Sequence, residues 1–241
     1  MIKKILLFGF VFFYAANTRG ETPESMISDF NRQLTIPSVT CNTKIIVERG
    51  KKTREYGLIF HMVVCRDGTE KTKVEVLSPK RKRATLWVVK NANGKKTAHL
   101  KLRDGKIRRR SSGLSDFFLK SCLQDIDFNI LEDMRNYSYT PGDENDQVFA
   151  ESTKPSSTYY TRRLIWMTKT DDGSWVKKKT IYFKGKGTIV KTTYESEQVM
   201  IDKKKWRPGR LVLENSDCRT TMIFTNWKVS QKIPEDEFIL K

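Results

Sequence analysis

The sequence predicts a mainly β protein in which about eleven antiparallel strands form one curled sheet and short helices cover it. Three observations support this fold class. Apolar residues alternate with a period of two over most of the chain, and Gly-containing turns separate these segments. Two further segments are amphipathic, with apolar residues at helical spacing. No internal repeat and no linker rich in Gly, Ser and Pro divides the chain. We therefore expect a single domain over residues 21–241.

The first 20 residues have the layout of a secretory signal peptide. Residues 1–4 form a positive start, and an unbroken apolar run of 12 residues covers 5–16. Small residues then offer cleavage points after Ala16 or Gly20. A membrane-spanning anchor is the alternative, but a span needs about 20 apolar residues and this run is shorter. We expect residues 1–20 to be removed and the mature chain to act outside the cytoplasm.

A short amphipathic helix is predicted directly after this segment. Thr22 provides a capping hydroxyl, and Pro23 suits the first helical position. Pro37 ends the helix. Because one side is strongly apolar, we expect the helix to lie on an apolar surface. Its apolar stripe consists of Met26, Ile27, Phe30 and Leu34.

Alternating segments in both halves of the chain predict the strands. Turns such as Asn93-Gly94 and Asp104-Gly105 favour hairpins, because Gly adopts positive φ without strain. The expected strands are 41–49, 56–65, 73–77, 84–90, 96–102 and 106–110 in the first half, and 157–168, 173–184, 187–198, 210–214 and 219–228 in the second. A sheet of this length twists and curls, and it must close or be covered.

Residues 111–155 separate the two groups of strands. Residues 111–134 carry apolar side chains among carboxylates, which predicts one or two short helices. Residues 135–155 are polar and rich in Gly, Asp and Pro, which is typical of a loop. An acid/base pair is conceivable among the carboxylates, but the solvated face of a helix is the simpler interpretation. These carboxylates are Asp125, Asp127, Glu132 and Asp133.

One face of the predicted sheet carries apolar residues from many strands. A curved sheet lined in this way, with helices across its mouth, forms an elongated apolar groove, whereas the alternative is an ordinary packed core. We assign lipid binding to the residues at even-numbered positions of this face. They are Leu58, Phe60, Met62, Leu86, Val88, Leu100, Leu164, Trp166, Met222 and Phe224.

The chain is strongly basic, with 46 Lys and Arg against 28 Asp and Glu and a net charge of +18. Such a surplus usually suggests nucleic acid, but an exported protein meets anionic lipids, glycolipids or acidic proteins instead. The alternative is a charge spread over a solvated surface. Two clusters next to turns argue against it, and we assign them to docking on anionic headgroups or a membrane. They comprise Lys80, Arg81, Lys82, Arg83, Arg108, Arg109 and Arg110.

Four cysteines in an exported chain are expected to pair. A hairpin centred on Thr53 would place Cys41 opposite Cys65, within disulfide reach. That pairing leaves Cys122 with Cys218. The alternative is four reduced, buried thiols.

Catalysis is not expected. The sequence contains no CxxC, and the two histidines, His61 and His99, are predicted to be structural residues of strands. No GxSxG elbow is present for a serine nucleophile. We therefore predict neither a metal site nor a cofactor.

The order of several motifs resembles the outer-membrane lipoprotein-sorting (LolA-like) protein family of bacteria. In the second half, residues 179–187 precede a strand and then Trp206-Arg207-Pro208, and the chain ends with residues 233–238. In the first half, residues 86–89 and the segment 115–118 fall where that family has a wall strand and the entry to its central helix. The similarity covers roughly residues 40–241. The strong basic charge and the four cysteines depart from the family pattern.

The resemblance implies an incomplete antiparallel β-barrel whose open side is covered by helices. It also implies a periplasmic carrier that holds lipid acyl chains of lipoproteins, or a related lipid, for transfer towards the outer membrane. Inner- and outer-membrane partner proteins and transient membrane contact would accompany this role, and we expect a monomer. The predicted lid is formed by Met26, Ile27, Phe30, Leu34, Phe117 and Phe118.

The alternative function is a binding or sensor module with the same scaffold, which recognises an anionic glycolipid or a protein partner and transports nothing. Salt separates the two functions, because headgroup or protein docking weakens steeply above about 0.2 M salt whereas acyl burial does not.

Overall fold

The fold is seen in a computed structural model that describes residues 21–109, 118–128, 131–156, 158–185, 187–203, 205–230, 232 and 238. The predicted signal peptide lies outside the described residues, as do Arg110, Phe117 and residues 233–237 of the C-terminal motif.

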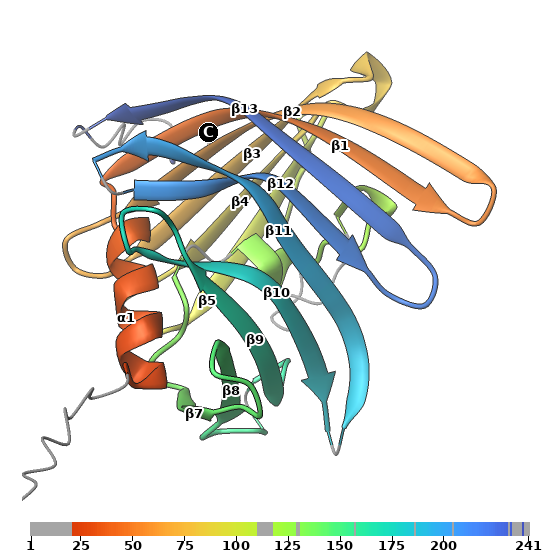
Figure 1. Ribbon diagram of the computed structural model, residues 1–241. Coiled ribbons are helices and arrows are strands. Elements are labelled where there is room, and N and C mark those ends of the chain that lie inside the picture. The colour runs from red at the N-terminus through yellow and green to blue at the C-terminus, as the bar shows by residue number, and fades with distance from the viewer. Residues whose placement is uncertain are drawn as a thin grey trace, which may run out of the picture.

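Thirteen strands form one antiparallel sheet that curls strongly but does not close (Figure 1). The order across the sheet is β6-β5-β4-β3-β2-β1-β13-β12-β11-β10-β9-β8-β7, so β6 and β7 are its two edges. The strands are β1 (Ser38–Arg49), β2 (Lys52–Val64), β3 (Glu70–Ser78), β4 (Ala84–Lys90), β5 (Lys96–Leu102), β6 (Ile107–Arg109), β7 (Tyr137–Pro141), β8 (Gln147–Ser152), β9 (Arg162–Lys169), β10 (Trp175–Lys184), β11 (Thr188–Asp202), β12 (Lys205–Glu214) and β13 (Arg219–Ser230).

The expected mainly β fold with a curled, open sheet is confirmed, but the expected number of strands is too low. The loop predicted over 135–155 is wrong, because β7 and β8 form a hairpin there. Their alternation is short, and the turn between them, 142–146, is dense in Gly, Asp and Asn. Antiparallel pairing of β8 with β9 joins the hairpin to the sheet, and Tyr139, Val148 and Ala150 pack under the helix.

The single α-helix of the described residues is α1 (Pro23–Leu34), which starts where the sequence predicts. Thr22 Oγ1 accepts a hydrogen bond from Ser25 N at 3.2 Å, and Pro23 occupies the first turn. The helix lies against β7, β10 and β12, on the concave side of the sheet (Figure 1). The expected central helices are only short 3₁₀ turns in the described part, η2 (Phe118–Lys120) and η3 (Asp125–Phe128), and η1 (Lys80–Lys82) is a third.

The buried apolar residues that the structure describes form two clusters. The first joins β1 to β5 with β12, β13 and the 118–128 segment, and it includes Ile45, Leu58 and Phe118. The second lies beneath α1 and includes Ile27, Val148 and Met167. The site described next lies where these two clusters meet.

Candidate functional site

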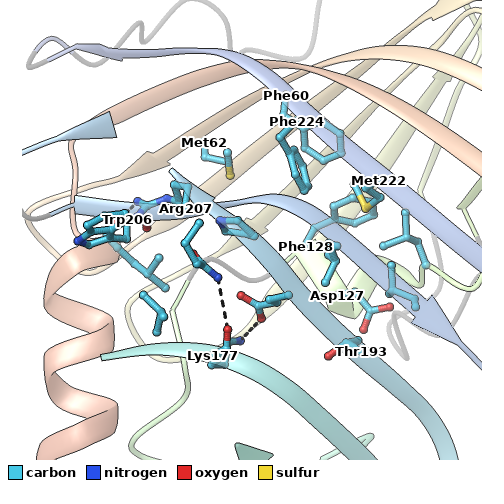
Figure 2. A pocket seen from close by; sticks show the side chains of 18 of the residues that line it. Phe60, Met62, Asp127, Phe128, Lys177, Thr193, Trp206, Arg207, Met222 and Phe224 are labelled. Carbon is cyan, nitrogen blue, oxygen red and sulfur yellow. Dashed lines mark hydrogen bonds and ion pairs between the residues drawn. The ribbon is translucent and has the colours of Figure 1, made fainter. Parts of the chain in front are cut away.

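A cavity of about 200 Å³ lies between the concave face of the sheet and α1 (Figure 2). It forms because Phe30 and Leu34 of the α1 cluster do not close over Phe60, Phe128 and the sheet residues beside them. Most of its wall is apolar. The wall consists of Phe30, Leu34, Phe60, Met62, Thr72, Leu123, Asp127, Phe128, Val176, Lys177, Tyr182, Lys191, Thr193, Glu195, Gln198, Trp206, Arg207, Pro208, Leu211, Leu213, Met222, Phe224 and Trp227.

Four of the ten predicted lipid-binding residues line this cavity. Phe60 and Met62 come from β2, and Met222 and Phe224 come from β13. Phe60 packs edge-on against Phe224, with ring centroids 6.2 Å apart, so the aromatic wall spans both strands. Figure 2 shows these side chains pointing into the same space.

The other six predicted residues lie elsewhere. Leu58, Leu86 and Val88 are buried in the first cluster and do not border the cavity. Leu100 lines a different, basic cleft.

The face predicted for Leu164 and Trp166 is wrong. On β9 the buried residues are Arg163, Ile165 and Met167, so the pleat points Leu164 and Trp166 to the other face of the sheet. Trp166 Nε1 donates to Glu144 at 3.2 Å, and Lys179 Nζ lies 4.5 Å from its ring centroid.

The predicted lid residues divide into three groups. Phe30 and Leu34 border the cavity, whereas Met26 and Ile27 are buried against the second cluster. Phe118 packs against Phe128 in the first cluster, with ring centroids 5.6 Å apart.

Several polar contacts hold α1 over the cavity, including one from Trp175 N to Asp29 Oδ2 at 3.0 Å and one from Lys205 Nζ to Arg32 O. The Asn31 side chain forms two bonds to the backbone of Glu132: Nδ2 donates to the carbonyl at 3.0 Å, and Oδ1 accepts from the amide at 2.8 Å. Gln33 Nε2 donates to Trp175 O at 2.7 Å. Arg207 donates to the last carbonyls of the helix, Gln33 O at 3.3 Å and Leu34 O at 3.1 Å.

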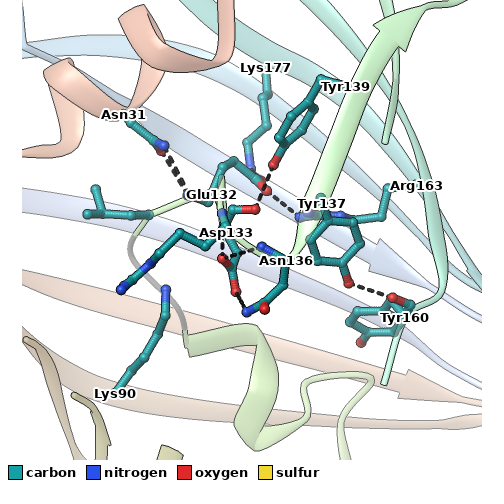
Figure 3. A network of polar contacts seen from close by, with 12 residues as sticks. Asn31, Lys90, Glu132, Asp133, Asn136, Tyr137, Tyr139, Tyr160, Arg163 and Lys177 are labelled. Atoms are coloured by element: carbon teal, nitrogen blue, oxygen red, sulfur yellow. Dashed lines mark hydrogen bonds and ion pairs between the residues drawn. The ribbon is translucent and has the colours of Figure 1, made fainter. Parts of the chain in front are cut away.

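A buried ionic network lies behind the cavity (Figure 3). The Glu132 carboxylate accepts from Arg163 Nη1 and, at 3.1 Å, from Lys177 Nζ. Lys177 also pairs with Glu195 at 3.3 Å. The Arg163 guanidinium stacks 3.9 Å from the ring centroid of Tyr137.

Charge neighbours set the ionisation of this network. Burial alone would raise the pKa of Glu132, but the charges of Arg163 and Lys177 outweigh it and lower the pKa to about 2. Burial raises the pKa of Glu195 above its usual value, against the opposing effect of Lys177.

The interpretation of the central carboxylates as a solvated helical face is wrong for two of them. Glu132 is buried in the network just described, and Asp127 forms an ion pair with Lys191. Tyr160 OH donates to Asp127 at 2.9 Å and accepts from Lys191 at 2.7 Å. The basic partners come from β9, β10 and β11, which lie far along the chain, so no local spacing pointed to them.

The predicted docking cations in the described part are exposed and gather at one end of the sheet. Lys80–Arg83 lie in and beside η1, between β3 and β4, and Arg108 and Arg109 lie on the edge strand β6. Arg81, Lys82, Arg83 and Arg103 line a cleft of about 530 Å³ whose apolar floor includes Leu100, Leu102 and Phe118.

The disulfide predicted between Cys41 and Cys65 is wrong. The β1–β2 hairpin turns between Arg49 and Lys52, so Cys41 faces Phe60 and is a buried thiol. Burial raises the pKa of this thiol to about 12. Thr53, the predicted centre of the hairpin turn, already belongs to β2, because this strand starts at Lys52.

Cys122 and Cys218 are also thiols in the structure, but they lie side by side. The Cys122 thiol donates to the Cys218 carbonyl at 2.7 Å. A bond between these two residues stays a prediction.

No cluster of three or more His, Cys, Asp or Glu side chains that would suit a metal occurs among the described residues. Within the same residues, no helix has the length and apolar character to span a bilayer. An apolar cavity roofed by a helix is suited to holding an apolar ligand.

Comparisons with known proteins agree with this geometry. A family model described as "Uncharacterized protein" matches residues 68–241. The comparison with curated proteins finds no match.

Three solved structures share the fold. A DUF1329 family protein from Desulfovibrio piger aligns with a TM-score of 0.79 and 18% identity, covering 91% of this chain and 98% of that one. A putative outer membrane lipoprotein-sorting protein domain from Vibrio parahaemolyticus gives 0.76 and 13%, with coverage of 90% and 97%. A LolA superfamily protein from Nitrosomonas europaea gives 0.65 and 16%, again with 90% and 97%. The chain therefore belongs to the family whose model matches residues 68–241, and it has the LolA-like fold.

Proposed function

We propose that this protein is a periplasmic carrier that holds lipid acyl chains of lipoproteins, or of a related lipid, for transfer towards the outer membrane. The observation that carries the proposal is the apolar cavity between the concave sheet and α1. The names of two structural neighbours, which refer to lipoprotein sorting and to the LolA superfamily, support the same kind of role.

The size of the cavity implies that α1 moves when cargo binds. At about 200 Å³ the cavity is smaller than typical ligand pockets of about 300–1,000 Å³. Burial of acyl chain contributes about 0.8 kcal/mol per CH₂, so a long chain supplies enough free energy to displace a helix. Phe30 and Leu34 border the cavity, and cargo larger than the cavity would push them aside.

The wall is suited to cargo of variable shape. Met62 and Met222 have flexible thioether side chains that adapt to irregular ligands, and Phe60 and Phe224 supply a broad apolar surface. The proposed role requires no catalysis and no cofactor.

Binding of a fluorescent fatty acid or lipopeptide to the mature protein tests this function. We expect saturable binding that a cavity-filling Leu211→Trp variant weakens about tenfold or more, because the indole occupies the space of the acyl chain. An Ile189→Trp variant is the matched control, since Ile189 is 59% exposed and outside the cavity. Absence of saturable binding, or equal binding by both variants, would contradict the carrier function.

The basic end of the sheet favours a second candidate, an envelope binding or sensor module that recognises an anionic glycolipid or an acidic protein. The exposed cations of η1 and β6 are the observation behind it. If ligand capture depends on these cations and disappears at high salt, while no acyl chain binds in the cavity, the sensor replaces the carrier.

A further inference from the structure

The charges in and behind the cavity wall do not balance. Lys191 pairs with Asp127, Arg163 and Lys177 share Glu132, and Lys177 also contacts Glu195. Four cations thus meet three carboxylates, because Arg207 also lines the cavity and forms no ion pair with a carboxylate of the described residues. Another buried ion pair joins Lys90 Nζ to Glu70 Oε1 at 2.6 Å and holds one charge of each sign.

Arg207 is 5% exposed, and its hydrogen-bond acceptors are neutral carbonyls, while Glu195 acts on it through charge without forming an ion pair. Its Nη1 donates to Trp206 O at 2.8 Å and to Gln33 O at 3.3 Å, and its Nη2 donates to Leu34 O at 3.1 Å. The C-terminus of a helix carries about half a negative charge, so α1 compensates only part of the guanidinium charge. Burial lowers the pKa of Arg207 to about 10, which leaves it charged at neutral pH.

These contacts leave two donors on the guanidinium. Three of its five N–H groups are used on carbonyls, and the remaining ones are Nε–H and one Nη2–H. Two neighbouring N–H groups match the two oxygens of a carboxylate. Figure 2 shows Arg207 beside Trp206 and Met62 at one end of the cavity, with the aromatic wall further along.

We propose that Arg207 binds the carboxylate of a single-chain fatty acid whose alkyl chain occupies the cavity. The proposal rests on the carrier function and adds a selection for acid over neutral amphiphiles. A carboxylate is smaller than a phosphate headgroup and therefore suits a cavity of about 200 Å³ better.

Competition among ligands of one chain length tests the proposal with the unmodified protein. Dodecanoic acid, dodecanol and dodecyl phosphate are each titrated as competitors against a bound fluorescent acyl probe at about pH 8, where the acid is ionised. We expect dodecanoate to act at a concentration about 10- to 100-fold lower than dodecanol, as for a charge-assisted hydrogen bond. Equal displacement overturns the Arg207 proposal alone, whereas displacement by none overturns the carrier function. Stronger displacement by the phosphate assigns the site to a phosphate headgroup and overturns the fatty-acid proposal.

The ratio of acid to alcohol affinity then assigns the effect to Arg207. We expect Arg207→Gln to reduce this ratio to about one and Arg207→Lys to keep part of it, since Lys retains the charge without the paired donors. Arg210→Gln on the same strand is the control, because the Arg210 side chain is half-buried outside the cavity lining and pairs with Glu197 at 3.8 Å. If a substitution shifts α1 and changes the affinity for every ligand equally, this ratio stays the same. If Arg207→Gln fails to unfold cooperatively, Arg207→Lys decides. An acid-to-alcohol ratio that is unchanged in Arg207→Lys, but is lost when Arg81, Lys82 and Arg83 are all replaced by Gln, overturns the proposal.

Discussion

Glu132 and Glu151 offer a direct comparison between a buried and an exposed carboxylate. Glu132 pairs with Arg163 in the interior, whereas Glu151 pairs with the adjacent residue, Arg162, at the surface. We expect Glu132→Gln to lower the free energy of unfolding by about 3 kcal/mol or more, because it leaves two buried cations with one carboxylate fewer. Glu151→Gln should change it by less than about 0.5 kcal/mol. Urea unfolding measures both, and similar losses in the two variants would contradict the network's role.

The same residue predicts how stability depends on pH. The pKa of Glu132 falls from an ordinary 4.5 to about 2 in the folded protein. A carboxyl whose folded pKa is depressed contributes stability above its unfolded pKa, and this contribution disappears as the pH falls from 4.5 towards 2. Unfolding free energies measured between about pH 6 and about pH 3 should therefore fall more steeply for the wild type than for Glu132→Gln. Parallel curves would mean that Glu132 does not cause the acid sensitivity.

Residues of this network show why sequence alone misassigned them. Asp127 and Glu132 alternate with apolar residues in the chain, and carboxylates in such a pattern are usually solvated. Their partners Lys191, Arg163 and Lys177 approach only because the sheet curls back on itself. An ion pair between a connecting segment and a distant strand leaves no periodic signal in the sequence.

At the scale of elements, α1 is the part of the fold that must move if the cavity admits an acyl chain. Asn31 forms both hydrogen bonds to the Glu132 backbone, whereas the neighbouring Arg32 pairs only with Asp29 of the same helix through its side chain. We expect Asn31→Ala to speed the uptake of a fluorescent acyl ligand about fivefold or more, because each lost bond favours the open state by about 1 kcal/mol. Stopped-flow fluorescence measures the rate, and Arg32→Ala is the control.

A purely structural helix gives a different result. In that case Asn31→Ala lowers the unfolding temperature but leaves the rate of ligand uptake equal to that of Arg32→Ala. The two readouts together therefore distinguish a lid from a fixed part of the core.

Elements whose signal is local were predictable. The capped start of α1 and the strands β4 and β5 match the sequence expectations, because proline, hydroxyl caps and Gly turns act within a few residues. Strand register was not predictable. The turn at 50–51 shifts the partner of Cys41 to Phe60, and β9 presents Ile165 in place of Leu164 to the interior.

Across the whole molecule, the antiparallel order of strands explains the basic end. In a meander, successive connections alternate between the two ends of the sheet. The β1–β2, β3–β4 and β5–β6 connections therefore share one end, and the β2–β3 and β4–β5 connections share the other. This arrangement brings Arg81, Lys82 and Arg83 next to Arg103 although they are separated along the chain. The sequence showed the clusters, but only the topology joins them into one surface.

A carrier that loads and unloads lipid benefits from a fixed orientation at the membrane, and the basic end provides one. We expect the protein to bind vesicles containing anionic lipid, with each Lys or Arg near the surface contributing about 1 kcal/mol. Neutralising Arg81, Lys82 and Arg83 to Gln should weaken binding about 100-fold at low salt. The matched control neutralises Arg66, Lys95 and Lys203, which are exposed in connections at the opposite end of the sheet. It removes the same charge as the first variant.

Vesicle sedimentation at several salt concentrations separates an oriented docking surface from a diffuse charge. Screening at about 0.2 M salt should abolish vesicle binding by the wild type but leave acyl-ligand binding in the cavity intact, because burial of an apolar chain does not depend on charge. If the two triple variants lose vesicle binding equally, the effect comes from net charge and the basic end has no special role. If only the Arg81, Lys82 and Arg83 variant loses it, the sheet approaches the membrane by the end that carries η1.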